Sequence, residues 1–196
     1  MERSVLKRQA KEAIKGNLWT LVAIFLVAYF VQLILGYATF WAGGVAGLLV
    51  AGSVTLSMAA TFLRLLKKQR KPQIEDLLLG FRGGNFGRGL IGHLRYTIFV
   101  FLWTLLFIVP GIIKGFSYSQ MFYLMADDPK LEPSEAQARS VDMMNGHKME
   151  LLVLYLSFIP WVLLTAATLG IALIYVVPYF NATLAAYHSY LKKETK

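Results

Sequence analysis

Residues Tyr96–Asp128 read YTIFVFLWTLLFIVPGIIKGFSYSQMFYLMADD, an apolar stretch interrupted once, at Pro110-Gly111. As a single helix of about 30 residues it would extend about 45 Å, longer than the roughly 30 Å hydrocarbon core of a bilayer. Proline removes a backbone donor and disfavours helix at the residue before it. We therefore predict a helix break at Pro110 and Gly111, between two short segments at about Tyr96–Val109 and Ile112–Met125.

The composition favours a membrane protein. Hydrophobic residues make up 57% of the chain and charged residues 16%, against about 45–50% and about 25% in soluble domains. Leu18–Leu35 contains Gln32 as its only strongly polar residue, and a transmembrane helix needs about 20 mostly apolar residues. We expect one all-α membrane domain over residues 1–196, a polytopic transmembrane helical bundle with about six spans.

Two of the six spans are the short segments on either side of Pro110. The other four are expected at about Leu18–Leu35, Phe40–Leu66, Leu151–Ala167 and Ile171–Tyr187. The first span is expected to stay in the protein and not to be removed as a signal peptide, because the apolar core of a signal peptide is typically only about 7–15 residues long. Pro160 and Pro178 are expected to kink the last two spans.

Two short helices are expected outside the spans. In Glu2–Lys15 the apolar residues recur at helical spacing and most basic residues lie off that stripe, which indicates an interfacial helix. Its stripe consists of Leu6, Ala10, Ala13 and Ile14. Pro133–Met144 is expected to form a short cytoplasmic helix.

The charge distribution tests the number of spans. With a turn at Pro110, 19 of the 20 Lys and Arg residues fall on one face of the membrane, and Lys114 alone falls on the other. With only a kink, one basic segment would move outside, against the positive-inside rule. A tight hairpin or a re-entrant pair gives the same sidedness, and both remain open. Both chain termini are then expected in the cytoplasm.

The net charge of +9 is assigned to membrane lipids and not to nucleic acid. Basic cytoplasmic loops hold the topology and attract anionic headgroups. In the segment Phe81–Gly89, glycines flank Arg82 and Arg88, so exposed backbone N–H groups could meet a phosphate. The alternative is a flexible basic loop beside lipid headgroups. His147 and Lys148, which precede the fifth span, are also candidate lipid contacts.

Lys114 stands out as an ionisable residue within an apolar segment, with Ser117 and Tyr118 one turn further on. Such a residue is a functional-site hypothesis by default. Lys114, Ser117 and Tyr118 are therefore candidate contacts for an anionic headgroup or carboxylate. The alternative is a lysine that extends to the outer interface.

Small residues recur every four positions in the second span, at Gly43, Gly47, Ala51, Thr55 and Ala59. Small residues at this spacing let two helices approach closely in lipid. They are interpreted as a packing seam within the monomer, with a homodimer seam or a membrane-protein partner as the alternative.

The residues offer little for catalysis. The chain has no cysteine and three histidines, His93, His147 and His188, with no paired His at helical spacing. We therefore expect no metal site, no cofactor and no enzyme activity. An intramembrane enzyme would need one of these histidines beside an acid such as Asp128 or Asp142.

A family resemblance follows from motifs spread over nearly the whole chain. They include Gly16-Asn17-Leu18-Trp19, Leu105–Lys114, Tyr118-Ser119, Ala126–Pro129, Gly146-His147-Lys148, Leu156–Ile159 and Pro178-Tyr179. In this order they resemble a bacterial integral membrane family catalogued as domain of unknown function 975. The pattern is also distantly similar to the membrane domain attached to some glycerophosphodiester phosphodiesterases, whose catalytic domain has no counterpart in this sequence. The resemblance implies a fold and a location in the bacterial cell membrane, with no activity to carry over.

Two functions remain. The first is a non-enzymatic membrane component that contacts lipids or partner proteins, suggested by the basic loops and the small-residue seam. The second is a small transporter or flippase for an anionic amphiphile, suggested by proline-broken helices and an intramembrane cation. The transporter predicts a polar cavity at the break between Pro110 and Lys114.

Overall fold

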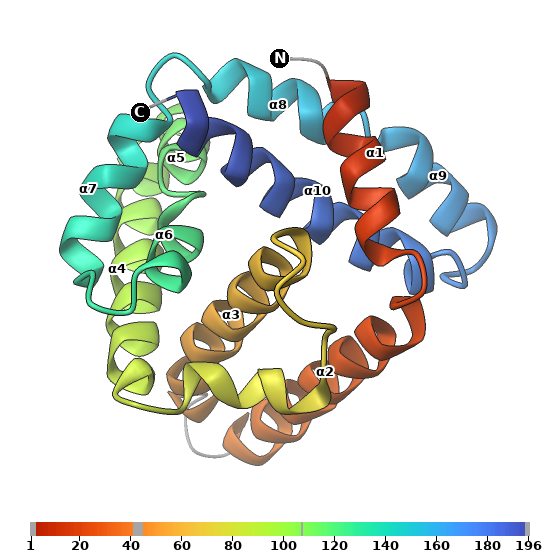
Figure 1. Cartoon of the computed structure of the whole chain (residues 1–196). Coiled ribbons are helices and arrows are strands. Elements are labelled where there is room, and N and C mark those ends of the chain that lie inside the picture. Colours follow the sequence, from red (N-terminus) through yellow and green to blue (C-terminus); the bar gives the residue numbers. More distant parts are fainter. Residues whose placement is uncertain (1–2, 41–44, 107, 195–196) are drawn as a thin grey trace.

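The computed structural model describes residues 3–40, 45–106 and 108–194, and its elements there are all helical. Figure 1 shows their arrangement. The elements are α1 (Arg3–Ile14), α2 (Leu18–Phe40), α3 (Val45–Leu66), the 3₁₀ helix η1 (Ile74–Gly80), α4 (Asn85–Leu106), α5 (Ile108–Ser117), α6 (Met121–Asp127), α7 (Pro133–Met143), α8 (Lys148–Leu156), α9 (Ile159–Ala167) and α10 (Leu173–Glu194). The all-α prediction is confirmed for these residues.

The position predicted for the helix break is wrong. Helix α4 ends at Leu106 and α5 begins at Ile108, so Pro110 and Gly111 lie inside the first turn of α5. Proline is tolerated there because its missing N–H would have no partner within the helix. The junction itself, at residue 107, lies outside the described residues.

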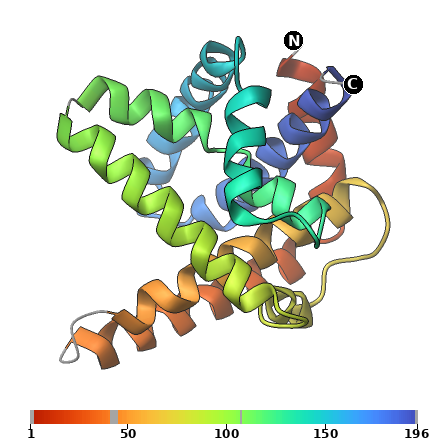
Figure 2. The ribbon, with the colours of Figure 1, turned by 90° about the vertical axis from the view of Figure 1, so that its left-hand side faces the viewer.

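Gly111 lets the two helices of this hairpin approach closely (Figure 2). A Cβ atom built at Gly111 would lie 2.2 Å from Thr104 Oγ1 of α4. The glycine is therefore needed for helix–helix contact, and not for a turn.

The expected fourth span, Ile112–Met125, is also divided. Helix α5 ends at Ser117 and α6 begins at Met121. Ten residues of α-helix extend about 15 Å, half the thickness of a bilayer core. Helix α5 is therefore too short to cross a membrane by itself.

The fifth span shows the same relation between proline and helix start. Helix α8 ends at Leu156 and α9 begins at Ile159, which places Pro160 in the first turn of α9. Ser157 and Phe158 form the break, so the kink lies just before the proline. Pro178, in contrast, lies inside the continuous helix α10.

Three segments are long and apolar enough to cross a membrane: Leu18–Leu35, Leu49–Leu66 and Lys148–Ala167. They correspond to α2, most of α3, and α8 with α9. The described residues therefore meet this criterion for three of the six expected spans.

Helix α10 lies at the centre of the packing and contacts α1, α2 and α3 (Figure 1). The predicted apolar stripe of α1 is real, since Leu6, Ala10 and Ile14 are all buried. It packs against protein, mainly α10, and not against a lipid surface. The N-terminal helix therefore belongs to the folded core.

The predicted seam takes part in packing at Ala59, which is buried in the core, but the closest approach of α3 to its neighbours lies elsewhere. Gly43 lies outside the described residues, a Cβ built at Gly47 meets open space, and Thr55 is exposed. The contact lies one residue further round the helix, where a Cβ on Gly52 would lie 2.0 Å from the carbonyl oxygen of Gly89 in α4. Likewise, a Cβ built on Gly80 of η1 would lie 2.0 Å from the carbonyl oxygen of Ser53.

Candidate functional site

A basic cavity of about 870 Å³ lies between α1, the end of α3 and α10. Its volume falls within the range of about 300–1,000 Å³ typical of ligand sites. Seven of its lining residues are basic and two, Glu12 and Asp127, are acidic. The basic residues are Lys15, Lys67, Lys68, Arg70, Lys71, Lys192 and Lys193. With a formal charge of +5, the cavity favours an anion.

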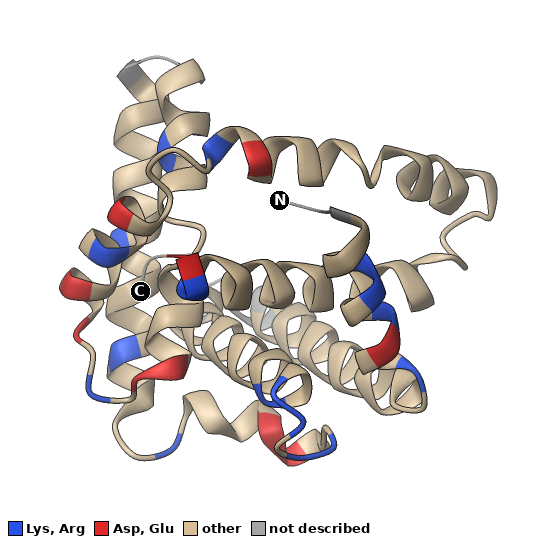
Figure 3. Ribbon diagram, turned by 45° about the horizontal axis from the view of Figure 1, so that its top comes forward, with Lys and Arg blue, Asp and Glu red and all other residues tan. Residues whose placement is uncertain are grey.

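Four separate segments of the chain supply these charges. Lys15 follows α1, the run from Lys67 follows α3, Asp127 ends α6 and the last two lysines end α10. Figure 3 shows the basic residues of α1, of the loop after α3 and of the end of α10. These are the segments that the charge count predicts on one face of the membrane, and the structure brings them to one cavity.

Asp127 is the centre of the ion-pair network at the cavity. The side chain of Asp127 is 5% exposed, and its carboxylate pairs with the ammonium groups of Lys67 and Lys192. Burial alone would raise the pKa of Asp127, but its contacts with His188, Lys192 and Lys67 hold that pKa well below its usual range. The acid is therefore ionised and fixes two cations at the cavity wall.

His188 lies behind Asp127 and is fully buried. Its Nδ1 atom is 3.2 Å from Gln120 Oε1, and Tyr123 stacks on its ring at a centroid distance of 5.4 Å. Its Nε2 atom lies 3.7 Å from Asp127 Oδ2 and has no hydrogen-bond partner among the described residues. Burial lowers the pKa of His188, although Asp127 opposes that shift.

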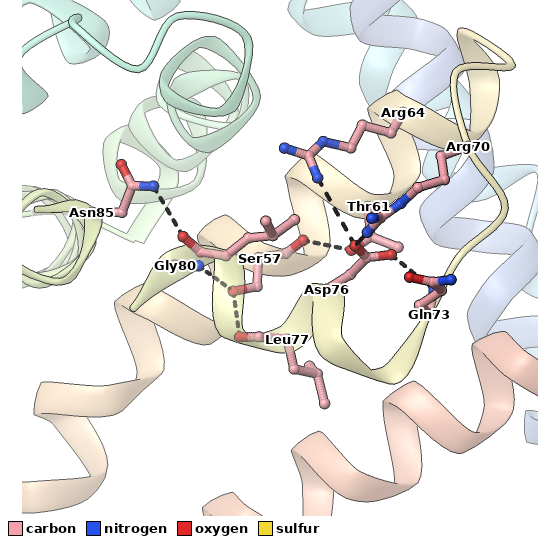
Figure 4. Close-up of polar contacts among 10 residues, drawn as sticks. Ser57, Thr61, Arg64, Arg70, Gln73, Asp76, Leu77, Gly80 and Asn85 are labelled. Carbon is pink, nitrogen blue, oxygen red and sulfur yellow. Dashed lines mark hydrogen bonds and ion pairs between the residues drawn. The ribbon is translucent and has the colours of Figure 1, made fainter. Parts of the chain in front are cut away.

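A second network holds the basic loop after α3 in place (Figure 4). Asp76 of η1 is buried, pairs with Arg70 and lies 3.9 Å from Arg64. It also accepts a hydrogen bond from the backbone N–H of Gln73 at 2.8 Å. Ser57 Oγ donates to the carbonyl of Leu77 at 2.7 Å and so ties η1 to α3. Together these contacts position the segment that carries the cations.

The end of α3 is closed by a cap that usually contains glycine. The N–H of Lys68 bonds to the carbonyl of Leu65, and the N–H of Gln69 bonds to that of Arg64. This pattern is a Schellman motif, whose left-handed position favours glycine. Lys68 occupies that position with a φ of 52°. The cavity wall therefore contains a lysine in a backbone conformation that costs roughly 1–2 kcal/mol for residues other than glycine.

The three residues predicted around the break do not form one polar site. Lys114 is half-buried with its ammonium group 4.8 Å from the ring centre of Trp103. Ser117 Oγ donates to the carbonyl of Ile113, and Tyr118 is buried against Phe99. The neighbourhood is aromatic, and the serine satisfies its own helix.

The predicted loop arginines also separate. Arg82 is exposed, whereas Arg88 points into the loop between α6 and α7. The guanidinium of Arg88 donates to the carbonyls of Asp128 and Leu131, both at 2.8 Å. Arg88 thus fixes the loop between α6 and α7, which is a structural role.

His147 and Lys148 lie together at the start of α8. His147 Nδ1 is 3.0 Å from Glu150 Oε2, and its carbonyl accepts a hydrogen bond from Tyr187 at 3.0 Å. Neither residue lines the basic cavity. Two of the three histidines lie beside acids other than Asp128 and Asp142: His188 faces Asp127, and His147 faces Glu150. His93 lies against the ring of Phe122.

The sequence does not predict the site formed by Lys67, Lys68, Asp127 and Lys192. Each residue is recognisable as part of a charged segment at a helix end, but their convergence depends on packing between distant helices. Among the described residues, no group of three His, Cys, Asp or Glu side chains is placed to hold a metal ion.

The fold and site define a helical protein with membrane-length apolar segments and a basic cavity between helix ends. The chain belongs to the family described as protein of unknown function (DUF975), whose model matches residues 1–116 and 105–195. No curated protein and no solved structure matches it.

Proposed function

We propose that this protein is embedded in a membrane and interacts there with anionic lipids through its basic end. The observation that carries the proposal is the exposed apolar surface of α2. Exposed large hydrophobic residues occur at nearly every position from Leu26 to Ile34. A helix that is apolar on all sides and leaves most of one face exposed is expected in lipid, and not in water.

The charge distribution supports the same reading. No Lys, Arg, Asp or Glu occurs between Glu150 and Lys192, and α9 carries no charge in Figure 3. The opposite end of α10 contributes to the basic cavity. A bilayer with the cavity at its cytoplasmic surface follows the positive-inside rule and places both termini in the cytoplasm.

The short length of α5 favours the re-entrant form of the α4–α5 pair. Helix α5 has ten residues, and α4 begins with the polar segment Asn85–Arg88. A hairpin that enters from the cytoplasmic side and returns there needs no full crossing by α5.

Cysteine labelling tests this topology directly, because the natural chain contains no cysteine. Single cysteines at Lys130 and Lys193 are expected to react only from the cytoplasmic side, and one at Leu169 only from outside. Release of the wild-type protein from membranes by alkaline carbonate would refute membrane embedding, and reaction of position 130 from outside alone would refute the sidedness.

The second candidate is a transporter or flippase for an anionic amphiphile. A cavity of about 410 Å³ lies beside α5, and its lining includes His93, Tyr96, Ser119 and Tyr155 among apolar residues. Ile112 of α5 also lines the cavity, which places it beside the segment from Pro110 to Lys114 and favours this alternative. Vesicles reconstituted with the protein should then scramble a labelled anionic lipid faster than empty vesicles. Equal scrambling rates in the two kinds of vesicle would refute transport, and only the lipid-binding role would remain.

A further inference from the structure

The basic cavity has a charge that the protein itself does not neutralise. Of its seven cations, Lys67 and Lys192 pair with Asp127, and Arg70 pairs with Asp76. The others, Lys15, Lys68, Lys71 and Lys193, are exposed and form no ion pair with a described residue. Among the described residues, Glu12 is the only other acidic residue of the lining, so the cavity keeps a net positive charge, and an anion bound there relieves the repulsion among its cations.

Asp127 prepares the cavity for such an anion. Its carboxylate holds the ammonium groups of Lys67 and Lys192 on the same wall while leaving their side chains 41% and 45% exposed. Both lysines therefore keep donors available for a second partner, since an ammonium group has three. The cations are positioned before a ligand arrives, which lowers the entropic cost of binding.

Lys68 supplies an independent sign of function. It takes a φ of 52° at the left-handed cap of α3, where glycine would be relaxed. Strained residues of this kind cluster at ligand sites. Gly16 and Gly146 take a φ near 80° at the ends of other helices, whereas Leu169 at the end of α9 takes a φ of 50° as Lys68 does.

We propose that the cavity binds a phosphate group carrying two negative charges, as in a phosphate monoester. Lysine binds phosphate as a point charge, and several cations around one cavity attract a dianion more strongly than the single charge of a carboxylate. The lining also includes Ala13, Leu65, Leu66 and Ala186, which offer apolar contact to the part that carries the phosphate.

The phosphate could be that of a lipid headgroup or of a soluble compound. The lipid source rests on the proposed function, because it requires the cavity to open at the membrane surface. The phosphate chemistry does not, since it depends only on the cavity. Binding by purified protein in detergent and retention in membranes are therefore separate measurements, and either can fail without the other.

The experiment uses the full chain purified in a neutral detergent. Binding of pyrophosphate is followed by thermal shift and calorimetry, and binding of lipid by flotation with vesicles containing phosphatidic acid or phosphatidylglycerol. We expect preference for phosphatidic acid, whose monoester carries the higher charge. Binding of phosphatidic acid without pyrophosphate identifies a headgroup site, and binding of both identifies a site for the phosphate itself.

Lys68→Gly is the decisive variant. It should raise the melting temperature without ligand, because it relaxes the cap, and weaken anion binding by about tenfold, because it removes one charged donor. Its opposite effects on stability and binding exclude misfolding as the cause. Lys130→Gly is the control, since it removes the same charge from an exposed lysine outside the cavity.

Two outcomes would overturn the proposal. One is that neither pyrophosphate nor phosphatidic acid binds to the folded wild-type protein. The other is an equal loss of affinity in Lys68→Gly and Lys130→Gly, which would show attraction by net charge alone. Lys192→Gln is a second variant of a cavity lysine, and we expect it to weaken anion binding by a similar factor.

Discussion

Two helix ends in this protein have the same backbone geometry and opposite surroundings. Lys68 closes α3 and Leu169 closes α9, and both take a φ near 50° in a Schellman motif. In the second motif, Leu169 bonds to the carbonyl of Ala166 and Gly170 to that of Thr165. Lys68 lines the basic cavity, whereas Leu169 is 96% exposed in a segment without charges.

The difference indicates that the medium, and not the backbone, selects these side chains. Glycine would satisfy both caps at lower conformational cost. A lysine suits a cavity that receives anions, and a fully uncovered leucine suits lipid or the lipid interface. The same strained position thus marks the polar end of the molecule and the apolar end.

The largest expected effect comes from placing a charge at the apolar end. Leu163 of α9 is 65% exposed, so Leu163→Arg causes no clash within the protein. If α9 lies in the bilayer, the arginine should cost about 2.5–3.5 kcal/mol near the membrane centre. The amount of membrane-inserted protein after expression, measured by carbonate extraction, should fall sharply.

Ala138→Arg is the matched control at the charged end. Ala138 is exposed on α7 and the substitution adds the same charge. It should leave the inserted amount unchanged, because surface substitutions usually change stability by less than about 0.5 kcal/mol. Equal behaviour of the two variants would remove the contrast between the two ends.

The next effect concerns the acid of the basic cavity. Asp127→Asn should destabilise the protein by about 2 kcal/mol, because two lysines lose their counter-ion beside a buried histidine. This is less than for a fully buried pair, since both lysines are nearly half exposed and solvent screens them. Denaturant unfolding in detergent measures it.

Asp142→Asn serves as the comparison for that loss. Asp142 is exposed on α7, and the same change of charge there should have little effect on unfolding. A similar loss in both variants would indicate a general effect of net charge, and Asp127 would then have no special place.

Several features of this fold follow from the sequence, and the reasons are local. The apolar stripe of α1 and the helical segments follow from periodicity. These properties are determined by neighbouring positions along one helix. Charge counting identifies the basic segments, but their convergence at one cavity depends on packing between distant helices.

Other features depend on contacts that the sequence leaves open. Pro110 is predicted to break a helix and Pro160 to kink one, but each lies in the first turn of the helix after the break. The small-residue spacing in α3 has two neighbouring registers, and only packing selects Gly52 over Gly47. In the sequence, Asp127 is only an acidic residue at the end of a helix. Its role as an ion-pair partner depends on α10, which places Lys192 and His188 beside it.

A smaller effect tests the caps themselves. Leu169→Gly should stabilise the detergent-solubilised protein by about 1 kcal/mol, because glycine takes the left-handed conformation without strain. Thermal unfolding measures the gain. The double variant with Lys68→Gly should show additive gains, because the sites share no contact, and a loss of stability in either single variant would contradict the strain assigned to that cap.

The smallest effect is a pH dependence confined to the charged end. Burial lowers the pKa of His188 in the folded protein, so the unfolded chain binds its proton first as the pH falls below about 6.5. Stability should therefore decrease from pH 7 to pH 5, a window in which Asp127 stays ionised because its folded pKa is depressed. His188→Phe keeps a ring for Tyr123 to stack on and removes the titration, so its unfolding curve should depend less on pH than that of the wild type. An identical slope in both proteins would place the titration elsewhere and leave His188 as a neutral packing residue behind the cavity.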